Sequence, residues 1–246
     1  MSINNTIKEL LERKSVRQFE DKEISDEDRE AILLSAVNAP SPGNQQMYKI
    51  IDVKDEKMKE ELSILCDNQP FIKKAKLVLV FCADFRKWID AFKSVGANAR
   101  DVGIGDMVLA IEDSMIASEN AVTAAWALGI GSCYIGDILE NREKVTELLK
   151  LPKYVFPSTV VVFGYPTEGQ MERVKPKRES LKHLVCENVY HESTSEELKE
   201  MFMEKQNLTE EEYVSWITAF CNRKFNSDFS KEMERSVNEY FKDYRG

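Results

Sequence analysis

The stretch DMVLAIEDSMIASENAVTAAWAL, residues 106–128, is the longest periodic segment of this 246-residue chain. Its large apolar residues recur at helical spacing, and Gly129 follows as a typical helix-ending residue. Three acids within it, Glu112, Asp113 and Glu119, argue against a membrane span. The segment predicts a long helix at the buried axis of the domain or of a dimer, because its small residues would let another helix pack closely: Ala110, Ala117, Ser118, Ala121, Ala124 and Ala125.

Shorter segments on both sides of this helix alternate between helix and strand patterns. Ser25 is a good N-cap for a helix that runs to about Asn38. The apolar run KLVLVFCAD, residues 76–84, is typical of a central strand. The alternation predicts an α/β or α+β class. The other expected helices are 3–11, 55–66 and 140–150, and the other expected strands are 49–53, 131–138 and 158–166.

Composition excludes several classes of protein. The apolar fraction of 43% is enough for a packed core, whereas no stretch has the roughly 20 apolar residues of a membrane span. The net charge of −9 disfavours nucleic-acid binding, which depends on neutralising phosphates. Five cysteines without CxxC spacing indicate reduced thiols, and two histidines make a zinc site improbable. The polar N-terminus shows no signal peptide, so we expect a cytoplasmic protein with no membrane, nucleic-acid or metal partner.

Two glycine motifs, GIGDMV and GIGSCYIG, fail as nucleotide-binding fingerprints. Neither has its third glycine at the required offset, and the first does not follow a convincing strand. The chain also has no Walker sequence and no Gly-x-Ser-x-Gly elbow. A Rossmann dinucleotide site, a P-loop enzyme and an α/β-hydrolase are therefore not expected.

The stretch RKSVRQF, residues 13–19, gathers cations around a hydroxyl in an acidic chain. One interpretation is a solvated helix end, where basic residues suit the helix dipole. The other is an anion site, because Arg13, Ser15 and Arg17 alternate and could direct two guanidinium groups and a hydroxyl at one phosphate. Composition alone does not separate the two.

Four further polar clusters follow in the chain, and each alone would suit a surface loop. PSPGNQQ (40–46) offers Ser41, Asn44 and Gln46 on a turn, and DNQPF offers the amide of Gln69. CYIGD offers backbone N–H groups beside a glycine. The fourth cluster is ERVKPKRES, with Lys175, Lys177 and Arg178.

Taken together and in this order, the clusters resemble the nitroreductase superfamily of FMN-dependent oxidoreductases. The resemblance is to the branch of NADPH-dependent oxygen-insensitive nitroreductases and NADPH–flavin oxidoreductases. It extends over residues 7–192, in these stretches: ERKSVRQFEDKEIS, APSPGNQQ, DNQPFI, VFCADF, LGIGSCYIGDILENREKVTELLKLP, VFPSTVVVFGYP, VKPKR and CENVYHE.

The resemblance implies an FMN pocket built from both chains of a homodimer. Arg13 and Ser15 would hold the phosphate, Arg17 would lie nearer the N1–O2 edge of the ring, and Lys14 occupies a contact position too. Ser41 matches the ribityl and phosphate loop, with Gln46 beside it.

Gln69 matches an amide that pairs with the pyrimidine edge of the flavin ring. At the phosphate, Lys175 and Lys177 match a Lys-Pro-Arg motif, with Lys177 where arginine is usual and Arg178 as an apparent insertion. A further segment matches the backbone that faces the ring near N5, with an Asp at 137 where relatives often have a second glycine: Tyr134, Ile135, Gly136 and Asp137.

The implied activity is ping-pong hydride transfer from NAD(P)H, with NADPH preferred, through FMN to a small-molecule acceptor such as a nitroaromatic, a quinone or a flavin. Hydride transfer requires no catalytic side-chain acid or base. Arg223 and Lys224, expected between two helices, are candidates for the NADPH 2′-phosphate. The alternative is a non-catalytic flavin-binding sensor or an interaction module, which the charged C-terminal helices would suit.

The implied fold is α+β, with a mixed sheet flanked by helices, in an obligate homodimer with a C-terminal arm. We expect an FMN-binding domain over residues 1–190. Residues 191–246 are charged and helical in pattern, and we expect them to form an extension on the same domain.

Overall fold

Residues 4–244 are described in this computed structural model, and they divide into two compact units. The first unit runs to Arg173 and includes the chain again from Glu232 onward. The second unit comprises residues 174–231. The expected division at residue 190, with both parts on one domain, stays a prediction.

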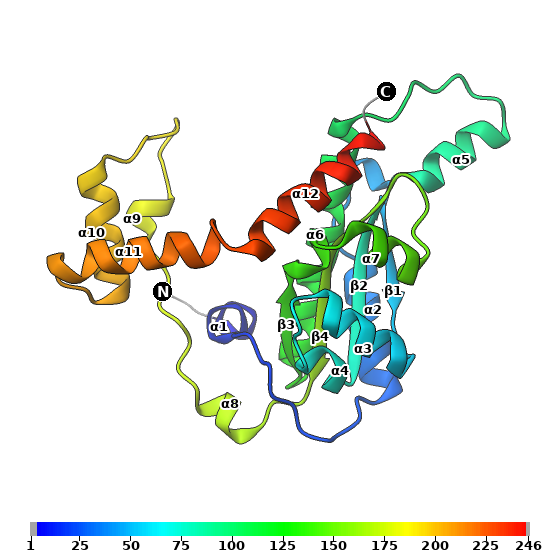
Figure 1. Cartoon of the computed structure of the whole chain (residues 1–246). Helices are drawn as coiled ribbons and strands as arrows, with labels where there is room; N and C mark the ends of the chain where they lie inside the picture. Colours follow the sequence, from blue (N-terminus) through cyan, green and yellow to red (C-terminus); the bar gives the residue numbers. More distant parts are fainter. Residues whose placement is uncertain (1–3, 245–246) are drawn as a thin grey trace. The chain divides into compact units, whose positions relative to one another are not determined.

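A four-stranded sheet forms the centre of the first unit (Figure 1). Its strands are β1 (Tyr48–Asp52), β2 (Leu77–Asp84), β3 (Gly131–Ile135) and β4 (Val155–Gly164). The strand order is β1-β2-β4-β3 and each of these pairs is antiparallel, so β1 and β3 are the two edges. The α+β class is confirmed. The parallel pairing expected of a mixed sheet is present as an isolated bridge between Ser15 and Ser132.

Both faces of this sheet are covered by helices. Alternate side chains of β2 and β4 point to opposite sides, and those on each side are apolar and pack against helices. Leu77, Leu79 and Phe81 of β2 pack on the face that carries α2 (Asp26–Val37) and α6 (Ile104–Ala127).

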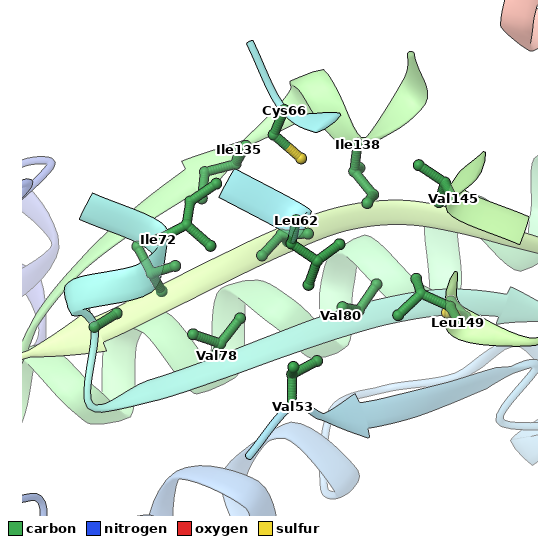
Figure 2. Close-up of a cluster of buried hydrophobic side chains, with 14 of the residues drawn as sticks. Val53, Leu62, Cys66, Ile72, Val78, Val80, Ile135, Ile138, Val145 and Leu149 are labelled. Atoms are coloured by element: carbon green, nitrogen blue, oxygen red, sulfur yellow. The ribbon is translucent and has the colours of Figure 1, made fainter. Parts of the chain in front are cut away.

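The intervening residues, such as Val78 and Val80, pack on the opposite face (Figure 2). The helices there are α3 (Glu56–Leu65), α4 (Phe71–Lys74) and α7 (Arg142–Leu149).

The predicted long helix is α6, and its two faces differ. Ala117, Ala121 and Ala125 are fully buried beneath the sheet, which places the small residues at the axis of the domain itself. At the start of the helix the Asp106 carboxylate accepts the Gly103 N–H, at 2.9 Å. The other face carries large apolar side chains that are 37–45% exposed: Ile104, Val108, Leu109, Met115 and Ile116.

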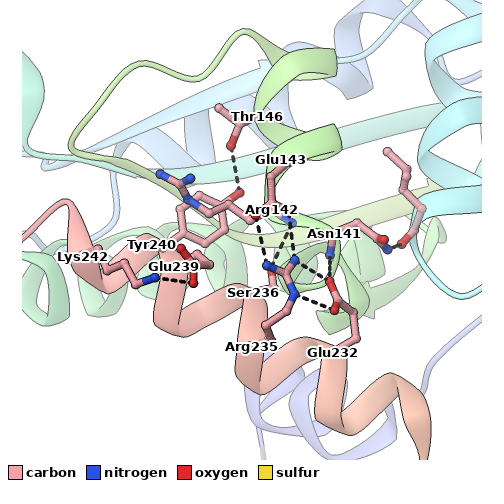
Figure 3. A network of polar contacts seen from close by, with 11 residues as sticks. Asn141, Arg142, Glu143, Thr146, Glu232, Arg235, Ser236, Glu239, Tyr240 and Lys242 are labelled. Carbon is pink, nitrogen blue, oxygen red and sulfur yellow. Dashed lines mark hydrogen bonds and ion pairs between the residues drawn. The ribbon is translucent and has the colours of Figure 1, made fainter.

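The last helix, α12 (Asp228–Lys242), packs its second half against α7 through a polar network (Figure 3). Arg235 contacts both carboxylate oxygens of Glu143, at 2.9 and 3.0 Å, and Ser236 accepts the N–H of Arg142. Beneath this network Tyr240 is buried, with its ring edge-on to Phe156 at 5.0 Å. Buried aromatic packing, more than the exposed ion pair, therefore holds this part of α12.

The remaining elements of the first unit are short connections. They are the helices α1 (Asn5–Glu12), α5 (Arg86–Ser94) and α8 (Glu168–Glu172), and the 3-10 turns η1 (Pro42–Asn44) and η2 (Gly136–Leu139).

The second unit is helical, as its charged composition predicts. Thr194 and Thr209 begin two helices with capping boxes, in which each threonine accepts an N–H three residues on and a glutamate there accepts its N–H in return. Trp216 packs between Phe202 and Phe220. The helices of this unit are α9 (Leu181–Leu184), α10 (Ser195–Gln206) and α11 (Glu210–Lys224), and α12 begins in it. Within residues 4–244, no helix combines the length and the apolar character needed to span a membrane.

Candidate functional site

The cationic segment at residues 13–19 lies along the β3 edge of the sheet, where two glycines let it approach. The N–H of Val16 donates to the carbonyl of Ser132, at 2.9 Å. A Cβ on Gly131 would lie 2.6 Å from Cγ2 of Val16, and a Cβ on Gly164 would lie 2.7 Å from the ring of Phe19. Since no side chain fits at either position, both glycines are required for the segment to reach the sheet.

Two buried polar groups in this segment and strand have no hydrogen-bond partner among the described residues. They are Nη1 of Arg13 and Oγ of Ser132. Ser15 forms a parallel bridge with Ser132, which brings the two hydroxyl residues together. Buried donors are normally satisfied, so a guanidinium nitrogen and a hydroxyl left unpaired here fit an anionic ligand such as a phosphate.

Arg17 is held from both its backbone and its side chain. Its N–H donates to Oε1 of the buried Gln170, at 2.9 Å, and its guanidinium lies 5.9 Å from the ring centre of Phe71. Burial raises the pKa of the Cys133 thiol in β3, while the positive charges of Arg17 and Arg13 oppose that rise. Both guanidinium groups therefore act on the same part of β3.

Lys14 is directed differently from its neighbours. Its ammonium donates to the carbonyls of Met171 and Arg173, at 2.5 and 2.6 Å. These carbonyls lie at the end of α8, where a cation suits the helix dipole. The helix-end interpretation concerned the preceding helix, whereas Lys14 contacts the end of α8; the anion-site interpretation fits Arg13.

Gln69 joins this edge from the loop between α3 and α4. Its Nε2 donates to Oδ2 of Asp137 in η2, at 2.7 Å. Two residues further along the chain is Phe71, whose ring lies near the Arg17 guanidinium. Contacts thus connect the Arg17, Phe71–Gln69 and Asp137 segments, which the resemblance assigned to one site from three separate motifs.

The segment of residues 134–137 continues β3 into η2. The Tyr134 hydroxyl lies 3.0 Å from Oγ of Ser118 and 3.1 Å from Oε2 of Glu119, and burial raises its pKa. Ile135 is buried, whereas Gly136 is exposed at the end of the strand. An exposed glycine leaves the backbone here open to close approach by a ligand.

Glu140 directly follows η2 in the chain, and it is 5% exposed. Its Oε1 has no hydrogen-bond partner among the described residues. Burial, together with the nearby carboxylates of Asp137, Asp67 and Glu232, raises its pKa to about 7. This carboxyl group therefore titrates near neutral pH.

The Ser41 loop lies elsewhere in the same unit, and its hydrogen bonds run inward. Ser41 Oγ donates to Oδ2 of Asp113 at 2.9 Å and accepts the N–H of Gln46 at 2.7 Å. The N–H of Met47 donates to the same Asp113 oxygen, and the Gln46 amide donates to the carbonyl of Val37. The sequence missed Asp113 as the organiser of this loop, although a lone acid in the small-residue face of α6 was a visible signal.

Ser41 and Ser15 are at diagonally opposite corners of the sheet. The Ser41 loop leads into β1, whereas β3 is three strand spacings or about 14 Å away, and Ser15 flanks the outer side of β3. The strand register also separates the two corners along the strand direction. Tyr48 of β1 is level with position 156 of β4, through its partner in β2, and Ser132 of β3 is level with position 163. Positions 156 and 163 lie roughly 20 Å apart along β4. Donors that share one phosphate are only about 6 Å apart, so these two corners of one chain cannot hold the same phosphate.

The other predicted residues belong to the second unit, and their binding roles stay predictions. Lys177 donates to the carbonyl of Glu204 at 2.7 Å, and Lys175 and Arg178 flank it in the chain. Arg223 and Lys224 were expected between two helices, but they form the last turn of α11. Each is near an aromatic ring: Phe220 at 5.6 Å and Phe229 at 5.4 Å.

Comparisons with known proteins agree with this arrangement. The model of the nitroreductase family matches residues 10–165. An FMN reductase [NAD(P)H] of Bacillus subtilis is 28% identical over 97% of this chain and 92% of its own length. An oxygen-insensitive NADPH nitroreductase of Salmonella typhimurium is 34% identical over 85% of this chain and 82% of its own.

Among solved structures, an NADPH:FMN oxidoreductase from Vibrio harveyi, in complex with NAD+, superposes with a TM-score of 0.82. It is 26% identical and covers 97% of this chain and 98% of its own. The fold defines an α+β protein whose sheet edge carries a cationic segment. The chain belongs to the nitroreductase family.

The glycine at position 131 provides a first test of this site. Gly131→Ala should push Val16 away from the sheet and displace the arginines, so binding of FMN to the apoprotein should weaken about tenfold or more, as expected for the loss of a charge-assisted contact. The control is Gly169→Ala in α8, where nothing lies within 4 Å of the added Cβ. Unchanged FMN affinity in Gly131→Ala would contradict this placement.

Glu140 predicts a pH dependence of stability. Its pKa is about 7 in the folded chain against a usual 4.5, so the stability it contributes is present below pH 4.5 and is lost as the pH rises through 7. Glu140→Gln should therefore raise the melting temperature, relative to the native chain, more at pH 8 than at pH 5.

The matched control is Glu143→Gln. Arg235 lowers the pKa of Glu143 to about 2, so this group stays ionised across that whole range. Its substitution should shift the melting temperature equally at both pH values. An effect of Glu140→Gln that is the same at pH 5 and pH 8 would show that this carboxyl does not titrate there.

Proposed function

We propose that this chain works as a homodimer in which each FMN site combines the cationic sheet edge of one chain with the Ser41 loop of the other. The predicted activity, an FMN-dependent NAD(P)H oxidoreductase, is confirmed by the family and by relatives named FMN reductase, NADPH nitroreductase and NADPH-flavin oxidoreductase. The observation that carries the proposed site is the pair of buried donors on Arg13 and Ser132, which have no hydrogen-bond partner within residues 4–244.

The residues of the sheet edge divide the work of holding the cofactor. Arg13, with Ser15 and Ser132 beside it, would bind the phosphate dianion through charge-assisted hydrogen bonds. Arg17, near Phe71, would place a positive charge at the ring and favour the negative charge that builds up there on reduction. FMN, when bound, supplies the hydride chemistry between NAD(P)H and the electron acceptor.

Two features support the dimer. The two corners with predicted FMN contacts are too far apart in one chain to share a phosphate, so completing the site requires a second chain. The outward face of α6 presents Val108, Met115 and Ile116 to solvent, each at least 37% exposed. A contiguous apolar helix face of this kind is typical of a protein–protein interface.

The acceptor class follows from the relatives, whose names include nitro, flavin and chromate reduction. We propose nitroaromatics, quinones or flavins as acceptors, because flat electron-poor rings can stack on a flavin face. A non-catalytic flavin sensor is not favoured, since the relatives named here are reductases.

A direct test combines binding with turnover. The purified protein should bind FMN and oxidise NADPH when a quinone or a nitroaromatic is added. Arg13→Ala should weaken FMN binding about tenfold or more, through loss of a contact of about 1.5–3 kcal/mol, with the fold intact by circular dichroism. FMN binding without NADPH oxidation would support the sensor, and absence of FMN binding would refute the proposal.

Charge on the outward face of α6 should prevent assembly. Ile116→Glu would bury an unmatched carboxylate at the interface, so sedimentation should show monomers that no longer retain FMN. The control is Ile64→Glu on α3, 57% exposed on the opposite side of the sheet, which should stay dimeric. A native chain that sediments as an FMN-loaded monomer would contradict the composite site.

Preference for NADPH over NADH should depend on the basic end of α11. A contact from Arg223 or Lys224 to the 2′-phosphate would be worth about 1.5–3 kcal/mol, or about ten- to hundredfold in preference. The double variant Arg223→Ala/Lys224→Ala should lose kcat/KM with NADPH alone. Equal losses with both donors would indicate a general defect, and an unchanged ratio would place the phosphate site elsewhere.

A further inference from the structure

The contacts around Gln69 fix both its backbone and the position of its side chain. The backbone of Gln69 is fixed at both ends by one residue: its N–H donates to the Ser63 carbonyl at 2.9 Å, and its carbonyl accepts from Ser63 Oγ at 2.8 Å. The side chain then reaches η2, where its Nε2 meets Oδ2 of Asp137 at 2.7 Å. These contacts fix where the amide group lies, and the remaining question is which of its ends, nitrogen or oxygen, faces Asp137.

Asp137 decides that orientation through its chemistry. An ionised carboxylate can only accept hydrogen bonds, so the amide nitrogen of Gln69 must face it and the amide oxygen must face away. A glycine at position 137 would place no such demand, and the amide could then present either its nitrogen or its oxygen.

A second carboxyl group lies beside Asp137. Glu140 is within hydrogen-bonding reach of it and is nine-tenths buried, and burial raises the pKa of Glu140. Asp67 and Glu232 also face Glu140 and disfavour a second negative charge there. Glu140 can therefore donate a proton to Asp137, and Oδ2 of Asp137 accepts from the Gln69 amide.

We propose that Asp137 is a positioning residue that turns the Gln69 amide oxygen toward the cofactor, so that the site selects a ring edge with an N–H donor between two carbonyls. This is the imide edge of a pyrimidine-dione ring. The inference rests on the proposed function, because it requires FMN to lie at the β3 edge beside Arg17 and Phe71.

The test compares FMN with its N3-methyl analogue, which lacks the imide N–H. Dissociation constants for both are measured with the apoprotein, by flavin fluorescence. The native chain should bind the analogue about three- to tenfold more weakly, as expected for one lost hydrogen bond. In Asp137→Ala the ratio of the two constants should fall toward one, because the amide is free to turn.

Two controls separate positioning from a structural role. Glu140→Gln retains a hydrogen-bond donor to Asp137 and should leave the ratio unchanged. If the Gln69–Asp137 bond only ties the loop to η2, Asp137→Ala will lower the melting temperature and weaken both ligands equally, and the unchanged ratio overturns the inference.

The proposed function can fail separately. A native chain that binds neither flavin overturns both proposals. A native chain that binds FMN tightly and shows the same ratio as Asp137→Ala overturns only the role of Asp137.

Discussion

The close approach of residues 13–19 to the sheet is the contact on which the candidate site depends. Val16 and Phe19 occupy the space that side chains on Gly131 and Gly164 would fill, and one backbone hydrogen bond fixes the register. This places Arg13 and Arg17 on the same strand edge, with Gln170 behind them. Without those two glycines the cations would be ordinary solvated residues after a short helix.

The long helix α6 serves two surfaces at once. Its small residues pack beneath the sheet, and a fully buried carboxylate on it, Asp113, holds the Ser41 loop through Oδ2. Its large apolar residues face outward. A substitution on the inner face therefore affects folding and the loop together, whereas under the proposed dimer a substitution on the outer face would affect association.

Much of this arrangement could be predicted from the sequence, because the spacing of apolar and small residues indicates which side chains are buried. The apolar run of β2 and the small-residue stripe of α6 predicted a central strand and a buried helix, and both are confirmed. The motifs around Arg13, Gln69 and Asp137 predicted one site, and the structure places Gln69 in contact with Asp137 and Arg17 near Phe71.

Other parts of the site were not predictable, since they depend on contacts between distant segments. Nothing in the sequence near Gln170 or Ser132 indicates that they meet the cationic segment. The separation of Ser41 from Arg13 also required the strand order, because each motif alone is equally compatible with one chain or with two.

The diagonal placement of the two corners has a genetic consequence under the proposed dimer. A chain damaged at Arg13 still carries an intact Ser41 loop, and a chain damaged in that loop still carries an intact cationic edge. Neither variant would form a working site with its own kind. Co-expressed, they would assemble into mixed dimers with one whole site beside one doubly damaged site, so two inactive alleles would complement each other within a single gene.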